Sequence, residues 1–328
     1  MRVGRIVEGL RCLARGVWGP AGYVVRPLLN RLKRHLFRVV TLGRGMTVRG
    51  HGWWGYYNGQ PGGGRDVFAQ TVSEVFDAVR RQFSADFGCD PRSAGTLLVF
   101  CYADTNGDKQ ALLDFGEKNL GLTRSLGRGL YLCQLPGVLI FLNPLLDGFR
   151  CVLAHELAHA LADLVLSRGA TDVFWASEGY AHYIAVVCQP DGMDLQHAYL
   201  ATVSEHCRSG QSFSLRQMLA ATAPSDDSQA DWLLRCQAAL FVSFLASLRA
   251  SRPAGWAALR TALAGQIRSP EQARESLEHA LDATDKMIEQ QFFDYCIDEA
   301  KRLPRELPSR LARHPQQFYG QIWKPKIN

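Results

Sequence analysis

The chain of 328 residues has no run of about 20 consecutive apolar residues, the length that a membrane-spanning helix needs. Arg, Lys, Gly, Pro or His interrupts every candidate run, so no transmembrane helix is expected. The basic N-terminus also lacks the uninterrupted apolar segment and the small-residue cleavage site of a secretory signal. We therefore expect a cytoplasmic protein, with at most a peripheral contact to a membrane.

Paired cysteines are also missing. The nine cysteines are odd in number, lie at least twelve residues apart and form no C-x-x-C pair, which excludes a disulfide framework and a zinc ribbon. Cys151, Cys188 and Cys236 lie in apolar runs, so we expect most of the thiols to be reduced and buried. With 47% hydrophobic and 21% charged residues, the composition is that of a folded globular protein.

Negative charge is scarce at one end. Residues 1–50 hold ten Arg and one Lys against the single Glu8. Within this basic N-terminal segment, residues 31–40 have the pattern of a cationic amphipathic helix. A solvated tail and an RNA or protein contact are alternatives. We expect docking on an anionic membrane surface, and no specific nucleic acid.

Residues 51–64 are rich in glycine and aromatic residues, which predicts a connector without a regular element. No GKS or GKT follows its glycines, so it is not a phosphate-binding loop. One domain is then expected over residues 65–303, followed by a basic tail over 304–328. A chain that begins at Arg65 is expected to stay folded.

Within this domain the apolar patterns predict a helix over 67–87 and buried strands over 96–102 and 138–143. Several further helices are expected from residue 149 onward. The expected strands are followed by a run of helices, which indicates an α+β protein with a helical C-terminal part.

Residues 149–163 predict a buried helix, because they are apolar on nearly every side. Within them, His155 and His159 are four positions apart, so their imidazoles project from one face of the helix and can chelate one zinc ion. Glu156 lies beside them, where a carboxylate can take a proton from a zinc-bound water. A core polar cluster without metal is the alternative.

A catalytic zinc ion has three protein ligands and one open position, so a third donor is needed. The extended metzincin pattern is excluded, because Ala162 and Val165 stand where it requires glycine and a donor. Eighteen residues separate His159 from Glu178, and two antiparallel helices joined near residues 167–169 would bring the two together. Otherwise Glu178 serves as a helix N-terminal carboxylate that balances a dipole.

The pattern resembles that of the gluzincin zinc metallopeptidases, whose signature is HExxH, a spacer of this length and a glutamate within W-x-x-E-G-x-A. Trp175, Glu178, Gly179 and Ala181 match that motif. The order of the expected elements, with Gly129 and Tyr131 between the two strands, is similar to the peptidase-MA-like branch over residues 65–300.

The resemblance implies a zincin-like metallopeptidase fold, in which a mixed sheet lobe holds the HExxH helix and a helical C-terminal lobe closes the site. It implies that His155, His159 and Glu178 are the zinc ligands and that Glu156 is the general base. It further implies that strand 138–143 pairs with an extended peptide substrate. No G-x-M-E-N segment lies between residues 121 and 143, which argues against an aminopeptidase.

Further residues could support the metal ligands or stabilise the oxyanion. Asp163 could accept the second ring N–H of His159, and His182 stands where some gluzincins carry a carboxylate. The family commonly supplies a tyrosine from a later helix to the oxyanion, but Arg235 occupies that position here. Arg235, Tyr180 or Tyr183 could therefore serve as the oxyanion donor.

The sequence thus predicts a zinc-dependent peptidase with one zinc ion per chain, acting within peptide or protein substrates. The alternative is a non-catalytic zinc-containing module for binding or scaffolding, which the missing tyrosine favours.

Overall fold

The computed structural model describes residues 46–58, 64–91, 96–102, 129–132, 137–140, 148–167, 173–189, 192–221 and 228–303. The chain divides into two compact units. The sheet unit comprises Met1–Gln70 and Thr96–Leu146, and the helical unit comprises Thr71–Gly95 and Asp147–Asn328. The predicted helix over 31–40 and the tail over 304–328 lie outside the described residues.

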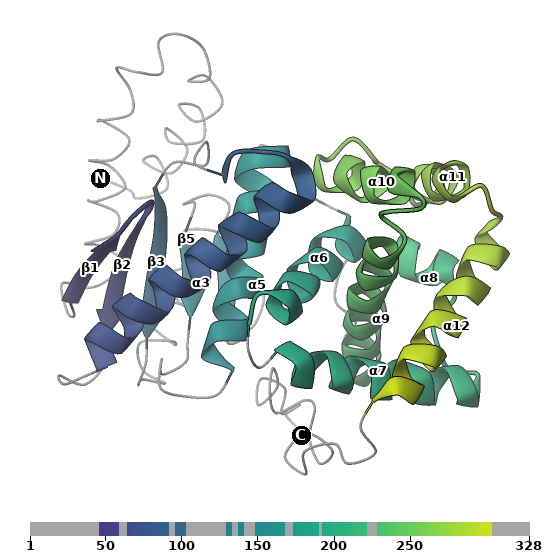
Figure 1. Ribbon diagram of the computed structural model, residues 1–328, viewed down its shortest axis with the longest axis horizontal. Coiled ribbons are helices and arrows are strands. Elements are labelled where there is room, and N and C mark those ends of the chain that lie inside the picture. The colour runs from purple at the N-terminus through teal and green to yellow at the C-terminus, as the bar shows by residue number, and fades with distance from the viewer. Residues whose placement is uncertain are drawn as a thin grey trace, which may run out of the picture. The chain divides into compact units, whose positions relative to one another are not determined.

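The sheet unit contains one mixed sheet in the order β1-β2-β3-β5-β4, of which Figure 1 labels β1, β2, β3 and β5. Its strands are β1 (Met46–Gly50), β2 (Trp53–Asn58), β3 (Leu97–Tyr102), β4 (Gly129–Leu132) and β5 (Gly137–Ile140). β2, β3 and β5 run parallel, while β1 and β4 pair antiparallel at the two edges. β3 is buried along its whole length, as expected of an apolar run inside a parallel sheet.

The strand predicted over 138–143 is therefore not an edge strand. β5 covers only Gly137–Ile140 and pairs with β3 on one side and with β4 on the other. Its backbone groups are used within the sheet, so β5 has no free side for an extended peptide. β4 is the outermost strand at this side of the described sheet.

The predicted connector over 51–64 also differs from the structure, because β2 lies within it. Trp53, Tyr56 and Tyr57 are buried, and β2 pairs with β3 in parallel. Aromatic residues favour strands when one face can be buried, and here they outweigh the glycines that surround them. The basic segment likewise contributes β1 at its end. A chain that begins at Arg65 would lose both strands.

The predicted helix over 67–87 is α3 (Gly64–Phe87). Its first turns belong to the sheet unit, where the ring of Phe68 packs on Trp53 and Tyr57. The rest of α3 belongs to the helical unit, where Phe83 and Phe87 pack against Tyr180. The apolar stripe read from the sequence is buried in both units.

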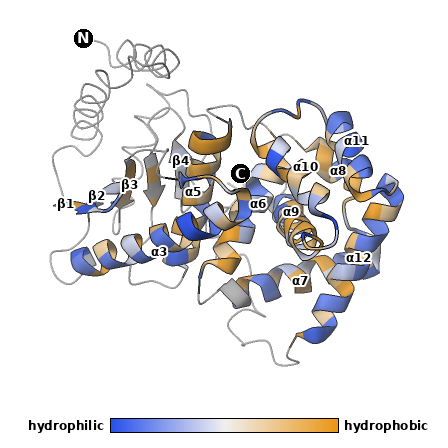
Figure 2. Cartoon of the chain, turned by 45° about the horizontal axis from the view of Figure 1, so that its top comes forward, coloured by the Kyte–Doolittle hydropathy of each residue, from blue (hydrophilic) through white to orange (hydrophobic). Residues whose placement is uncertain are grey.

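The helical unit continues with the elements that follow the sheet in sequence. They are α5 (Phe149–Leu161), the π-helical segment η2 (Ala162–Ser167), α6 (Phe174–Val187), α7 (Gly192–Ser209), α8 (Leu215–Ala220), α9 (Ser228–Ser247), α10 (Pro253–Leu263), α11 (Pro270–Leu281) and α12 (Asp285–Arg302). α6 packs against α5 and α9 (Figure 1). Figure 2 shows both hydrophobic and hydrophilic colour on α10 and α12, as expected of helices with one buried face.

The structure also bears on the expectations for the cysteines and for membrane-spanning helices. Every cysteine among the described residues is a free thiol, and Cys151 and Cys236 are buried while Cys188 is half-buried. In the described part of the chain, no helix combines the length and the apolarity needed to cross a membrane.

Candidate metal centre

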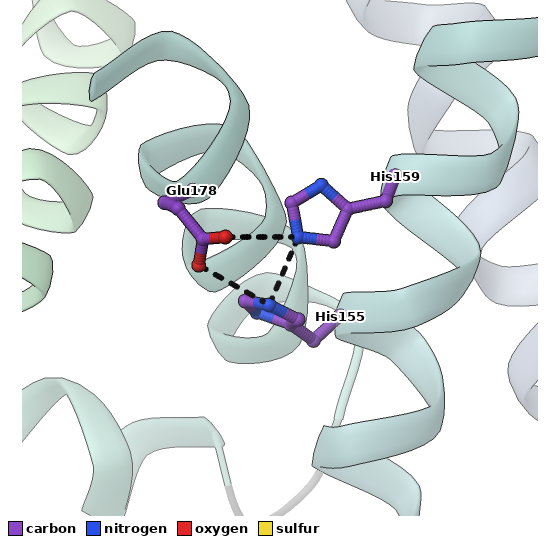
Figure 3. Close-up of side chains that lie close together, drawn as sticks. All are labelled: His155, His159 and Glu178. Atoms are coloured by element: carbon purple, nitrogen blue, oxygen red, sulfur yellow. Dashed lines mark hydrogen bonds and ion pairs between the residues drawn. The ribbon is translucent and has the colours of Figure 1, made fainter. Parts of the chain in front are cut away.

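Three donor side chains from α5 and α6 meet in the helical unit. The Nε2 atoms of His155 and His159 lie 3.0 Å apart. Oε2 of Glu178 lies 3.6 Å from Nε2 of His155, and Oε1 lies 3.6 Å from Nε2 of His159 (Figure 3). The structure thus brings together the three residues that the sequence predicts as ligands.

The backbone explains how these side chains come together. α5 begins after Gly148, whose φ of 85° lies in the left-handed region that glycine adopts without strain. α5 packs against α6, and the alanines Ala154, Ala158, Ala176 and Ala181 of the two helices are buried.

The donor set fits a divalent metal ion. A tetrahedral zinc ion with bonds of about 2.0–2.1 Å holds neighbouring ligand atoms about 3.3 Å apart, close to the distances between these three side chains. Two imidazoles and one carboxylate also form a common catalytic zinc set. His155, His159 and Glu178 could therefore hold such an ion with little movement.

The charge around the donors favours a cation as well. Arg235 interacts electrostatically with three carboxylates, which belong to Glu178, Asp231 and Glu156. One guanidinium cannot neutralise three carboxylates, and buried charge without compensation is costly. A divalent cation between the histidines and Glu178 would restore the balance.

Burial keeps the histidines in the neutral form that binds metals. It lowers the pKa of His155 well below the usual value, and the charges of His159 and Arg235 add to this effect. Burial also lowers the pKa of His159, against the opposing effect of Glu178. For Glu178, burial acts to raise the pKa, but Arg235 and the histidines outweigh it, so the pKa is lowered and the group stays ionised.

The second ring nitrogen of His159 has a partner on α6. Its Nδ1 lies 3.1 Å from Oγ of Ser177. Asp163, the residue predicted for this role, is buried in η2 and raises the pKa of His159 through its charge. The ring nitrogen of a metal-binding histidine that does not bind the metal usually donates its N–H to a neighbouring acceptor, and this hydrogen bond fixes the orientation of the ring. Ser177 orients His159, and Asp163 adds negative charge nearby.

His182 borders the cluster from α6. Its Nε2 lies 3.9 Å from Oε2 of Glu178, and its ring lies 4.4 Å from the ring of His155 between centroids. Nδ1 of His182 lies 2.7 Å from the hydroxyl of Tyr199 on α7. The structure thus places His182 next to Glu178, with its ring anchored by a second helix.

Arg235 on α9 also reaches the cluster. Its Nη1 donates to Oε2 of Glu178, and its Nε donates to Oδ2 of Asp231 at 2.9 Å. The guanidinium lies over the ring of Phe174, 5.5 Å from the centroid. Of the three predicted oxyanion donors, Arg235 is the one that contacts a candidate ligand.

The two tyrosines face another part of the helical unit. The hydroxyl of Tyr180 donates to Oδ2 of Asp86 on α3 at 3.1 Å. The ring of Tyr183 packs on Tyr180 and on Trp256 of α10. Both rings lie on the side of α6 that contacts α3 and α10.

Glu156 is buried on α5 with 8% of its surface exposed. Its charge acts on Arg235, which places its carboxylate in the electrostatic environment of the candidate ligands. It is not one of the three donors that converge. This separation suits a carboxylate that handles protons and does not bind the metal.

Sequence reasoning missed three supporting residues, which are Ser177, Tyr199 and Asp231. Ser177 directly precedes Glu178, so its position beside the donors was readable once α6 was assigned. Asp231 stands one helical turn before Arg235, which is the spacing of an ion pair on one helix face. Tyr199 had no such signal, because the packing of α7 on α6 cannot be read from local sequence.

Comparison of the chain with protein-family models and with curated protein sequences found no match.

Proposed function

We propose that this protein is a zinc-dependent peptidase that hydrolyses bonds within peptide or protein substrates. The observation that supports it most is the convergence of His155, His159 and Glu178, with the buried Glu156 on the same helix as the two histidines. The HExxH and W-x-x-E-G-x-A patterns that resemble those of gluzincins support the same proposal.

A zinc ion held by these three donors would polarise the substrate carbonyl and lower the pKa of a bound water. His155, His159 and Glu178 supply the donor atoms. Ser177 orients the ring of His159 through its Nδ1.

Glu156 acts as the general base in this proposal. Its carboxylate takes a proton from the water that attacks the peptide carbonyl, and then gives this proton to the leaving amine. Its burial among apolar α5 residues limits competing contact with bulk water.

The second candidate function is a zinc-containing module for binding or scaffolding. It is favoured by the position of the two tyrosines, because Tyr180 donates to Asp86 and Tyr183 packs on Trp256. In this case the metal would hold α5 and α6 together without turnover.

Digestion of a diverse peptide library by the zinc-loaded full-length protein separates the two functions. The isosteric variant Glu156→Gln is the matched control, because it keeps the donors and loses the base. Cleavage by the wild type that falls at least about 100-fold in Glu156→Gln is the expected result. Zinc binding without any cleavage would favour the scaffolding module.

A further inference from the structure

We propose that Arg235 is a positioning residue that holds Oε2 of Glu178, so that this carboxylate binds the metal through Oε1 alone. The inference rests on the proposed metal site and assigns a different role to Arg235 from the oxyanion donor that the sequence suggests.

The two oxygens of Glu178 have different surroundings. Arg235 donates to Oε2 through Nη1, and Nε2 of His182 lies 3.9 Å from the same oxygen. Oε1 lies 3.6 Å from Nε2 of His159. Oε2 lies at the same distance, 3.6 Å, from Nε2 of His155. Each oxygen thus lies near one histidine, and the contact that distinguishes them among the described residues is the hydrogen bond from Arg235 to Oε2. This hydrogen bond occupies a lone pair of Oε2 and favours Oε1 as the oxygen that binds the metal.

Arg235 is itself held in place. Asp231 accepts from its Nε at 2.9 Å, and the guanidinium stacks on Phe174. α9 also approaches α6 closely at this point. A Cβ atom added to Gly179 would lie 2.6 Å from the carbonyl oxygen of Ala238, one turn beyond Arg235. The glycine after the ligand thus lets α9 bring Arg235 onto Glu178.

These contacts favour a positioning role for Arg235 over the role of an oxyanion donor. A donor for the oxyanion must present an N–H toward the substrate. Of the five N–H groups of Arg235, those on Nε and Nη1 donate to Asp231 and Glu178, and the charges of these carboxylates oppose the charge of the guanidinium. The guanidinium of Arg235 is therefore arranged to orient the carboxylate of Glu178.

Partners that orient a metal ligand typically contribute 10- to 100-fold in metal affinity. For Arg235 this gain opposes its repulsion of the metal, since both are cations. The three carboxylates around Arg235 keep the field negative with the guanidinium in place, so orientation is expected to outweigh repulsion.

The test measures zinc affinity of the full-length protein by competition with a chelator. The variants are Arg235→Gln and Arg235→Lys. Arg235→Gln removes the positive charge and the planar guanidinium, and Arg235→Lys keeps the charge but loses the planar array of N–H donors. Arg249→Gln is the matched control. Arg249 pairs with Asp86 at 3.0 Å and stacks on Trp256 in the same way, without touching a candidate ligand.

Both Arg235 variants should bind zinc about 10- to 100-fold more weakly than the wild type, while Arg249→Gln binds it with wild-type affinity. With Co²⁺ in place of zinc, the visible absorption of the wild type should be that of a four-coordinate ion. In Arg235→Gln this absorption should weaken, because the released Oε2 joins the coordination.

Equal or tighter zinc affinity in Arg235→Gln, with an unchanged cobalt spectrum, would overturn the positioning role. If zinc affinity stayed constant and only kcat fell, Arg235 would be an oxyanion donor, and the proposed peptidase function would stand. A wild-type protein that binds neither metal would overturn the positioning role and the proposed function together.

Discussion

Glu178 is a half-buried carboxylate surrounded by groups that can stabilise its negative charge. His155 and His159 approach it from α5, and Arg235 approaches it from α9. In a cluster of neutral imidazoles and excess carboxylates, the component that would complete the charge balance is a metal cation.

A second buried carboxylate, Asp86, provides a prediction about pH. Burial raises its pKa to about 6 from the usual 3.8, although Tyr180, Gln82 and Arg249 oppose the shift. The folded state therefore holds this proton more tightly than the unfolded state. The stabilisation is complete below about pH 4 and is lost as the pH rises through 6.

We expect the free energy of unfolding of the wild type to fall by about 2 to 3 kcal/mol from this group between pH 4 and pH 6.5. In Asp86→Asn this part of the slope should disappear. Urea unfolding at several pH values measures both proteins. An identical pH dependence in the two would show that Asp86 titrates normally in the folded state.

At the scale of elements, the contact of α6 with α9 depends on Gly179. Alanine in a helix is ordinarily favoured over glycine by about 1 kcal/mol. Here an added Cβ would lie 2.6 Å from the carbonyl oxygen of Ala238, and a backbone atom cannot move aside as a side chain can. Overpacking of this kind costs about 1 to 3 kcal/mol and should exceed the gain.

Gly179→Ala should therefore lower the melting temperature, and Gly255→Ala is its matched control. At Gly255 the added Cβ would meet Cδ2 of Leu281 at 2.8 Å, the flexible end of a side chain. The control should lose much less stability. A Gly179→Ala protein as stable as Gly255→Ala would mean that α6 and α9 separate without cost.

The sequence predicted most elements because their periodicity is strong. α3, α5, α6 and α9 are found where apolar spacing and the HExxH and W-x-x-E-G-x-A patterns indicated helices. β2 was missed because the glycines of residues 51–64 outweighed the aromatic residues when only the local sequence was considered, whereas burial and pairing with β3 decide the structure. The pairing of β5 on both sides was missed because strand order depends on contacts between distant segments.

For the site, the spacing of two histidines and a glutamate in the sequence was sufficient to predict that these three donors lie close together, as they do in the structure. The partners of these donors depend on helix packing. Tyr180 and Arg235 were equal candidates in the sequence, and only the rotation of α6 shows that Tyr180 faces Asp86 while Arg235 meets Glu178.

At the scale of the whole molecule, the basic N-terminal residues remain proposed as a membrane-docking segment. Residues 1–45 hold nine of the ten arginines of the basic segment, whereas β1 and β2 belong to the sheet. A truncation that begins the chain at Met46 therefore removes most of the basic residues and keeps both strands, whereas a truncation at Arg65 removes the strands as well.

Full-length protein should sediment with acidic phospholipid vesicles at low salt and be released as salt rises, because each basic side chain near the surface contributes about 1 kcal/mol. A chain of residues 46–328 should stay folded and lose this binding. A chain of residues 65–328 should be less stable, because it lacks two paired strands. Equal vesicle binding by the full-length and 46–328 chains would contradict a docking role.

The central claim is that His155, His159 and Glu178 together hold one metal ion. Metal analysis of the purified full-length protein by mass spectrometry tests it most directly, with the variants His155→Ala, His159→Ala, Glu178→Ala and Glu156→Gln compared under the same zinc buffer. We predict about one zinc per chain in the wild type and in Glu156→Gln, and loss of most zinc in the other three. Wild-type zinc content in His159→Ala and Glu178→Ala, with both proteins folded, would contradict the account.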